Sequence, residues 1–343
     1  MMQTPMRIES ALPIAACDCR QTLTMRIRRV ISVLVVVALT LAGCSSTSST
    51  GTAPSAPLVP MRRLVRAAHP VQPFAVGEDL YFGERLTGRI RRVLAGGRLA
   101  ADPVAIIPVI GSIDDQRGLL GLARTPEGRI FAAGVRPGDQ RLVVVEVSRV
   151  APLRLVWVGP VTADRANGGA LAVAADGSLL VGIGDLLADP ALARDPSVPN
   201  RKVLALDVAG SVDQQPQVLS AGWNNPYAIT VDERGVPWVA DNAGGRARER
   251  MGRADRPATE ARPLGRVGET RAPSALVALG RNRFGVCGYV SRRVDEVRVV
   301  NGAASVTGRV LAKPCAEGAT RLTDGRLVTA TEDAIWISRR PAT

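Results

Sequence analysis

Few residues in this sequence could carry chemistry, and its single histidine narrows the choice most. Imidazole is the commonest general base near neutral pH and a frequent metal ligand, but His69 follows a Ser-, Thr- and Pro-rich stretch. In that setting we do not expect a Ser/His/Asp triad, a histidine-rich zinc site or a histidine-based hydride abstraction. Carboxylates and calcium could instead serve a hydrolase or lactonase, with Asp185 and Asp241 as the candidates.

The cysteines indicate an exported protein. Cys17 and Cys19 precede the targeting signal described below, and Cys44 is the expected site of lipid attachment. Cys287 and Cys315 are the two cysteines of the main body. No histidine or third cysteine is available there for a metal, so we expect a disulfide, with two separate buried thiols as the alternative.

The charge balance does not identify a nucleic-acid-binding protein. The chain has 343 residues and a formal net charge of +13, with 46% hydrophobic and 3% aromatic residues. Of its 44 basic residues only Lys202 and Lys313 are lysines, a bias that a GC-rich genome also produces. Because the arginines are scattered and few aromatic rings are available for base stacking, nucleic acid is not an expected partner.

The N-terminal segment predicts the compartment. From Met25 the sequence reads MRIRRVISVLVVVALTLAGC: three arginines, an uncharged run over 30–41 and small residues before Cys44. The run is too short to span a bilayer but suits a signal peptide that ends at a lipidated cysteine. The alternative is a buried helix that happens to end in Ala-Gly-Cys. We therefore expect an exported protein on the outer face of the cytoplasmic membrane, whose partner is the lipid bilayer, reached through acylated Cys44.

These signals divide the chain into four parts. Residues 1–24 are an upstream extension or mis-start, 25–43 the signal peptide, 44–73 a lipidated cysteine with a flexible Ser/Thr/Pro-rich tether, and 74–339 the folded body.

The elements of the folded body repeat. Short apolar runs alternate with Gly, Pro and Asp-Gly punctuation, and no stretch shows a sustained helical period, which predicts an all-β fold. The same hairpin returns with turns at 127–128, 176–177, 234–235 and 324–325. With two less regular units this gives about six repeats of forty to fifty residues, the spacing of propeller blades. We expect a six-bladed β-propeller, with a pair of β-sandwiches as the alternative.

Four segments carry a family resemblance. The stretches 116–123 (QRGLLGLA), 168–185, 201–207 and 222–229 resemble, in the same order, motifs of the glucose/sorbosone dehydrogenase family. The resemblance spans nearly the whole body and implies a six-bladed propeller that oxidises sugars with pyrroloquinoline quinone and calcium. Together with the lipid-attachment motif, the chain is similar to LppZ-type lipoproteins of actinobacteria.

The departures from this family concern the residues that do its chemistry. The position of the catalytic histidine corresponds to Ala166, and an arginine that binds the quinone corresponds to Asn224. A further basic position aligns with Ser291, where the adjacent Arg292 could partly replace it as a cofactor-facing residue, and two arginines of the family fall near Cys315 and Glu317. The calcium loop aligns near Ala243 and Gly244, while Gln116 and Asn225 are the cofactor-facing positions that are kept.

Three functions are therefore open. The residues favour a binding or interaction lipoprotein whose catalytic centre is lost and whose partner is an unidentified envelope protein or glycan. The alternative is an active dehydrogenase that uses pyrroloquinoline quinone and calcium to oxidise the CH–OH groups of aldoses. The third is the hydrolase or lactonase built on Asp185 and Asp241.

Overall fold

The computed structural model describes residues 58–148, 152–243, 247–266 and 268–339, and these form six four-stranded antiparallel sheets. Blade 1 contains β2 (Pro70–Val76), β3 (Asp79–Glu84), β4 (Arg89–Val93) and β5 (Ala105–Ile106). Blade 2 contains β6 (Leu119–Arg124), β7 (Ile130–Val135), β8 (Arg141–Val147) and β9 (Arg154–Val161). Blade 3 contains β10 (Gly168–Val173), β11 (Leu179–Ile183), β12 (Lys202–Leu206) and β13 (Gln217–Ala221). Blade 4 contains β14 (Ala228–Val231), β15 (Pro237–Asp241), β16 (Arg250–Arg253) and β17 (Arg262–Pro263). Blade 5 contains β18 (Pro273–Ala278), β19 (Arg283–Gly288), β20 (Arg293–Val300) and β21 (Ala303–Ala312).

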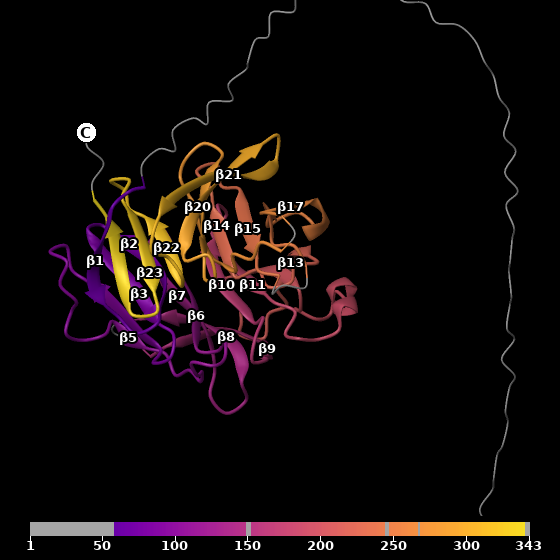
Figure 1. The fold of residues 1–343 in the computed structure, drawn as a ribbon. Coiled ribbons are helices and arrows are strands. Elements are labelled where there is room, and N and C mark those ends of the chain that lie inside the picture. Colours follow the sequence, from indigo (N-terminus) through magenta and orange to yellow (C-terminus); the bar gives the residue numbers. More distant parts are fainter. Residues whose placement is uncertain (1–57, 149–151, 244–246, 267, 340–343) are drawn as a thin grey trace, which may run out of the picture. The chain divides into compact units, whose positions relative to one another are not determined.

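The sixth blade closes the ring with both ends of the body. It contains β22 (Gly318–Arg321), β23 (Leu327–Thr331), β24 (Ala334–Ser338) and, as its outermost strand, β1 (Met61–Arg66). Figure 1 shows the indigo β1 beside the yellow strands of this blade. The first strand of each blade contacts the first strands of the blades on either side, including β22 with β2. The structure is thus an all-β six-bladed β-propeller, which confirms the fold expected from the repeats.

The start of the ring was predicted too late. Residues 61–66 and 70–76 form strands and are not part of a tether. β1 pairs with β24, which without it would be an open edge of the sheet. The expected boundary at residue 74 is therefore wrong. His69 belongs to the propeller, directly before β2, and not to a flexible lead-in.

The hairpins explain the repeat seen in the sequence. In four blades the turn between the first two strands lies at 127–128, 176–177, 234–235 or 324–325, and the second strands β7, β11, β15 and β23 follow it. These second strands are buried nearly throughout, since each is covered on both faces by neighbouring blades.

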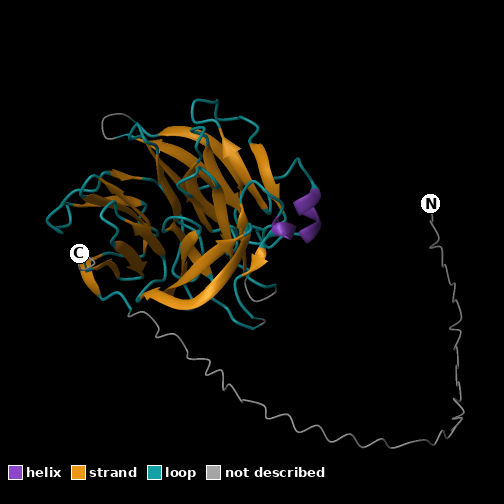
Figure 2. Ribbon diagram, turned by 90° about the horizontal axis from the view of Figure 1, so that it is seen from above, coloured by secondary structure: helices purple, strands orange, loops and turns teal. Residues whose placement is uncertain are grey.

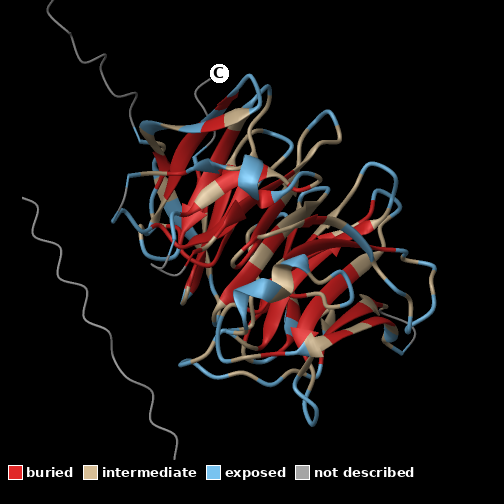
Figure 3. Ribbon diagram, turned by 90° about the vertical axis from the view of Figure 1, so that its right-hand side faces the viewer, coloured by how far each residue is buried: buried red, intermediate tan, exposed pale blue. Residues whose placement is uncertain are grey.

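The hydrophobic core lies between blades. Phe131 and Trp157 of blade 2 pack with Leu179 and Leu204 of blade 3, and Trp238 of blade 4 packs against Phe284 of blade 5 with ring centroids 5.2 Å apart. Figure 3 shows the buried strands in red, with the exposed residues mostly in the loops.

Helices are minor within the described part. Two short 3-10 helices, η1 (Pro190–Arg194) and η2 (Ala258–Glu260), lie in loops, and Figure 2 shows the helical turns together on one side. No helix in the described ranges is long and apolar enough to cross a membrane. The expected signal peptide, Cys44 and the tether up to residue 57 lie outside the described residues.

A disulfide joins blade 5 to blade 6. Cys287 in β19 is bonded to Cys315, which precedes β22, with a Cα–Cα distance of 5.7 Å, and both residues are fully buried. The two cysteines are therefore not separate thiols.

Candidate functional site

A cavity of about 270 Å³ opens at the end of the ring where the first strands of the blades begin. Its lining comes from the residues directly before or at the start of β6, β10, β14, β18 and β22, and from the residues that follow β3, β15 and β19. Every blade therefore contributes to it. The volume falls just below the usual range for drug-sized ligands, about 300–1,000 Å³, so the cavity suits a small molecule.

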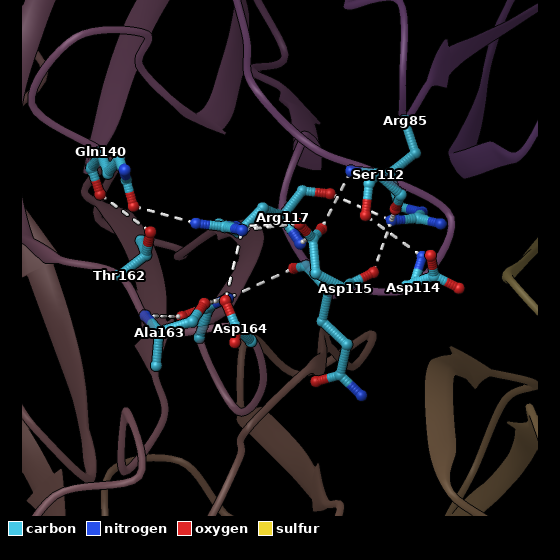
Figure 4. Close-up of polar contacts among 11 residues, drawn as sticks. Arg85, Ser112, Asp114, Asp115, Arg117, Gln140, Thr162, Ala163 and Asp164 are labelled. Atoms are coloured by element: carbon cyan, nitrogen blue, oxygen red, sulfur yellow. Dashed lines mark hydrogen bonds and ion pairs between the residues drawn. The ribbon is translucent and has the colours of Figure 1, made fainter.

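Arg85 fixes one wall of this cavity. It follows β3, is 8% exposed, and its Nη1 donates to the carbonyl oxygens of Ser112, Asp115 and Arg117 at 2.9–3.1 Å. Figure 4 shows this guanidinium enclosed by the loop that leads into β6. One terminal nitrogen of Arg85 is thus used to hold protein backbone and not a ligand.

Asp115 and Arg117 brace the same loop. Nη2 of Arg117 lies 2.8 Å from Asp115 and 3.2 Å from Asp164, and its Nη1 donates to Gln140 at 2.9 Å (Figure 4). Burial works to raise the pKa of Asp115, but donation by the Ser112 and Arg117 amides and by the Arg117 guanidinium outweighs it, so this pKa lies below its ordinary value. The carboxylate stays charged and already paired.

Gln116 and Asn225 both line the cavity and are oriented in the same way. Oε1 of Gln116 accepts from the backbone N–H of Ala166 at 2.9 Å, and Oδ1 of Asn225 accepts from that of Gly168 at 2.9 Å. Because the two carbonyl oxygens accept from the loop before β10 and from the first residue of β10, each amide is left with its NH₂ group for other partners. Neither NH₂ group has a hydrogen-bond partner among the residues described.

Ala166 stands where the family resemblance implies the catalytic base, and it offers no proton acceptor on its side chain. Its backbone adopts φ +57° and is held at both ends, by Gln116 at its N–H and by the N–H of Leu186 at its oxygen, 3.1 Å away. Gly168, two residues further along the chain, has φ +72°, and a Cβ there would lie 2.2 Å from the oxygen of Gly182. The Gly-Gly motif is explained by this close approach of strands, without any ligand.

Asn224 lies behind the cavity in a buried polar cluster centred on Asp241. The fully buried Asp241 carboxylate accepts from the backbone N–H of Asn224 and Asn225 and from Nε of Arg250, 3.0 Å away. Burial raises the pKa of Asp241, and Arg250 and the backbone donors oppose that rise. Asp241 therefore positions the loop that carries Asn225 and is not itself part of the cavity lining.

The other predicted site residues also lie away from the lining. Asp185 accepts from the N–H of Leu187 at 2.9 Å, and Arg292 pairs with Glu332 through Nη2 at 2.7 Å. Ala243 is buried, and Gly244 lies outside the described residues. Asp185 and Asp241 do not converge on the cavity, so the hydrolase hypothesis has no support from their placement.

Glu317 is the acidic residue that sequence reasoning missed. It lines the cavity just before β22, its side chain is 7% exposed, and its Oε1 accepts from Nδ1 of His69 at 3.0 Å. Tyr227, on the same cavity, has a pKa raised by its burial and further by the nearby Glu317 carboxylate. The signal that could have revealed Glu317 was the replacement of a family arginine near this position by a carboxylate.

The charges of the cavity do not fit the quinone that the resemblance implies. Pyrroloquinoline quinone is a tricarboxylate and needs several fixed cations. The charged side chains of the lining are Arg85 and Arg165 against Asp114, Asp115 and Glu317. Arg85 is partly committed to carbonyl oxygens, Arg165 is exposed, and Glu317 would repel a carboxylate.

The residues described also hold no prepared metal centre. No group of three or more His, Cys, Asp or Glu side chains in those ranges is arranged to bind a metal ion.

The comparisons with known proteins define the class of fold. The sequence matches no protein-family profile and no curated protein. Its structure is similar to the soluble aldose sugar dehydrogenase of Escherichia coli in its apo form, with a TM-score of 0.68 and 17% identity over 82% of this chain and 100% of that one. It is also similar to the aldose sugar dehydrogenase of Streptomyces coelicolor in its pyrroloquinoline-quinone-bound form, with a TM-score of 0.63 and 18% identity over 81% and 97% of the chains.

A protein of another activity has the same architecture. A streptogramin B lyase is similar with a TM-score of 0.51 and 12% identity, covering 82% of this chain and 98% of that one. The protein is therefore a six-bladed β-propeller with the fold of the quinone-dependent sugar dehydrogenases. This confirms the resemblance found in the sequence at the level of the fold, and a fold by itself does not assign a reaction.

Proposed function

We propose that the chain is a lipoprotein of the cell envelope whose propeller binds a small ligand and has lost the sugar oxidation of its structural relatives. The signal over 25–43 and the lipid-attachment motif at Cys44 support an anchor in the outer face of the cytoplasmic membrane. The propeller would then be displayed outside the membrane, where an envelope protein or glycan could serve as partner.

The charge of the central cavity carries this proposal. Its lining carries the carboxylates of Asp114, Asp115 and Glu317 and the guanidiniums of Arg85 and Arg165. Asp115 is already paired with Arg117, whereas Glu317 has one oxygen without a protein donor among the residues described and would repel an anionic cofactor. At the position expected for the base, Ala166 has no group that could take a proton from a sugar hydroxyl. A general base contributes about 10²–10⁴-fold to rate, and losing each buried charge-assisted contact costs about 1.5–3 kcal/mol.

An active dehydrogenase that uses pyrroloquinoline quinone and calcium is the second candidate. The observation that favours it is the position of His69, which lies beside the cavity and holds Glu317 instead of lying in a tether. An imidazole and carboxylate pair at this place could take over proton transfer from the missing base.

A reconstitution assay separates the two. The purified protein is incubated with pyrroloquinoline quinone and calcium, then given glucose and a dye acceptor, with the Escherichia coli aldose sugar dehydrogenase treated in parallel as the positive control. We expect no dye reduction above the protein-free background. Reduction that requires both the quinone and calcium would establish the dehydrogenase instead.

The anchor is tested separately. A Cys44→Ser variant should lose incorporation of labelled palmitate and leave the membrane fraction, whereas Cys287→Ser should keep both. Membrane retention and labelling of the Cys44→Ser variant would contradict lipid attachment at this residue.

A further inference from the structure

The strongest unexplained feature of the cavity is the carboxylate of Glu317. Its side chain is 7% exposed and it lines the cavity. His69 satisfies Oε1 at 3.0 Å, but Oε2 has no hydrogen-bond partner among the residues described. This oxygen is not among the fully buried atoms without a partner, so it is accessible from the cavity, and a donor that carries positive charge would pair with it best.

The surroundings of Glu317 add recognition groups of a different kind. The amides of Gln116 and Asn225 are held by their oxygens and present NH₂ donors, which suit hydroxyl, carbonyl or ether oxygens of a ligand. Tyr227 and Tyr289 line the same cavity, and their rings can contact both an apolar ligand face and a cation.

Arg85 does not cancel this preference. Three backbone carbonyl oxygens surround its Nη1 at 2.9–3.1 Å, so much of its hydrogen-bonding capacity is directed into the loop before β6. Asp114 lies exposed on that loop and adds negative charge on the same side.

We propose that the cavity binds a small hydroxylated amine in its protonated form. The ammonium group would donate to Oε2 of Glu317 against the tyrosine rings, and the hydroxyl or ring oxygens would accept from the NH₂ groups of Gln116 and Asn225. This rests on the proposed binding function and adds the chemical class of the ligand. His69 is a positioning residue, because it holds the carboxylate through Oε1 and leaves the other oxygen for the ligand.

The test uses three probes that share one carbon skeleton and differ in charge. Glucosamine carries an ammonium group, glucose is neutral and glucuronate, which keeps the same pyranose ring, is an anion. Each is titrated into the purified protein by calorimetry up to about 10 mM, where affinities near 1 mM are still measurable. A charge-assisted hydrogen bond to Glu317 predicts that glucosamine binds about tenfold or more tighter than glucose, and that glucuronate binds more weakly still.

Two variants connect the preference to the residues named. Glu317→Gln should bind glucosamine no more tightly than glucose, whereas Glu260→Gln, the same change at an exposed carboxylate, should behave as wild type. Tyr289→Leu changes a half-exposed ring, so the variant should fold like wild type. It should lower the affinity for glucosamine by about two- to fivefold. Thermal unfolding checks each variant.

The outcomes separate this inference from the proposed function. Equal binding of glucosamine and glucose, no binding of glucosamine, or a preference that survives Glu317→Gln in a folded protein would each overturn the amine assignment. None of these results would restore the dehydrogenase. Only binding of the quinone, or quinone-dependent dye reduction, would overturn the binding function itself.

Discussion

His69 and Glu317 are separated by 248 positions in the chain and meet across the closure of the ring, where Nδ1 of His69 donates to Oε1 of Glu317 at 3.0 Å. His69 lies between the last strand of blade 6 and the first strand of blade 1, and Glu317 lies directly before β22. The contact therefore links the two blades that close the propeller to the wall of the central cavity.

Removing this donor should destabilise the fold. His69→Ala leaves the buried Glu317 carboxylate without its protein donor, and we expect the free energy of unfolding to fall by about 1–3 kcal/mol. Urea unfolding at pH 7 measures it. His69→Gln, which keeps a side-chain N–H donor, should recover part of the lost stability. Equal stability of His69→Ala and wild type would show that the contact does not stabilise the fold.

The outermost strand β1 should be required for the ring. Leu64 packs against the core shared by blades 1 and 6, while Arg63 beside it is exposed. A charge at Leu64 would be placed against apolar side chains, whereas a charge at Arg63 stays in water. Leu64→Asp should therefore lower the free energy of unfolding by about 2 kcal/mol or more, and Arg63→Asp by much less. Similar melting temperatures for both variants would mean that β1 is not packed as described.

The disulfide should contribute strongly to stability. Cys287 and Cys315 are 28 positions apart, and closing a loop of that length is worth about 3–4 kcal/mol in the chain-entropy account. The double variant Cys287→Ala/Cys315→Ala should unfold at a correspondingly lower denaturant concentration. Wild type unfolded and refolded under reducing conditions should match it, and a double variant as stable as oxidised wild type would refute the prediction.

Acid should weaken an ion-pair cluster between blades 2 and 3. Glu146 has side-chain exposure of 21% and a pKa lowered to about 2, first by the hydrogen bond from Arg129 and then by Arg154. Both arginines also donate to the oxygen of Val208 in the next blade. Because the folded-state pKa lies below the ordinary 4.5, this stabilisation is complete above pH 4.5 and is lost as the pH falls toward 2.

The matching variant makes that dependence measurable. Glu146→Gln should be less stable than wild type at pH 7 by about 1–2 kcal/mol after allowance for solvent screening, and the difference should vanish near pH 2. Glu78→Gln, at an exposed residue with no ion pair among those described, should show no such trend. A constant difference between Glu146→Gln and wild type from pH 7 to pH 3 would contradict the lowered pKa.

The fold could be predicted from the sequence because its signal is local. The turn at Asp176-Gly177 and the apolar strand after it form one hairpin, and that unit recurs in other blades. The first boundary could not be predicted this way. β1 is polar and exposed along much of its length, and only its pairing with β24 at the far end of the body makes it a strand.

The cavity was predictable only where neighbouring residues define it. Gln116 and Asn225 lie in motifs with fixed spacing, and both line the cavity. Asn224 and Asp241 are also residue types that are common in binding sites, but their side chains point into a polar cluster behind the lining. The spacing of residues in the sequence does not reveal this orientation. Glu317 and His69 acquire their role from ring closure, so their partnership depends on tertiary structure alone.

The most direct test of the account is a calorimetric titration of the purified protein with pyrroloquinoline quinone, with and without calcium. A cavity lined by three carboxylates and two guanidiniums should give no binding heat at quinone concentrations of hundreds of micromolar. Stoichiometric, calcium-dependent binding at micromolar affinity or tighter would contradict the loss of the quinone site and make the protein a sugar dehydrogenase with a rearranged centre.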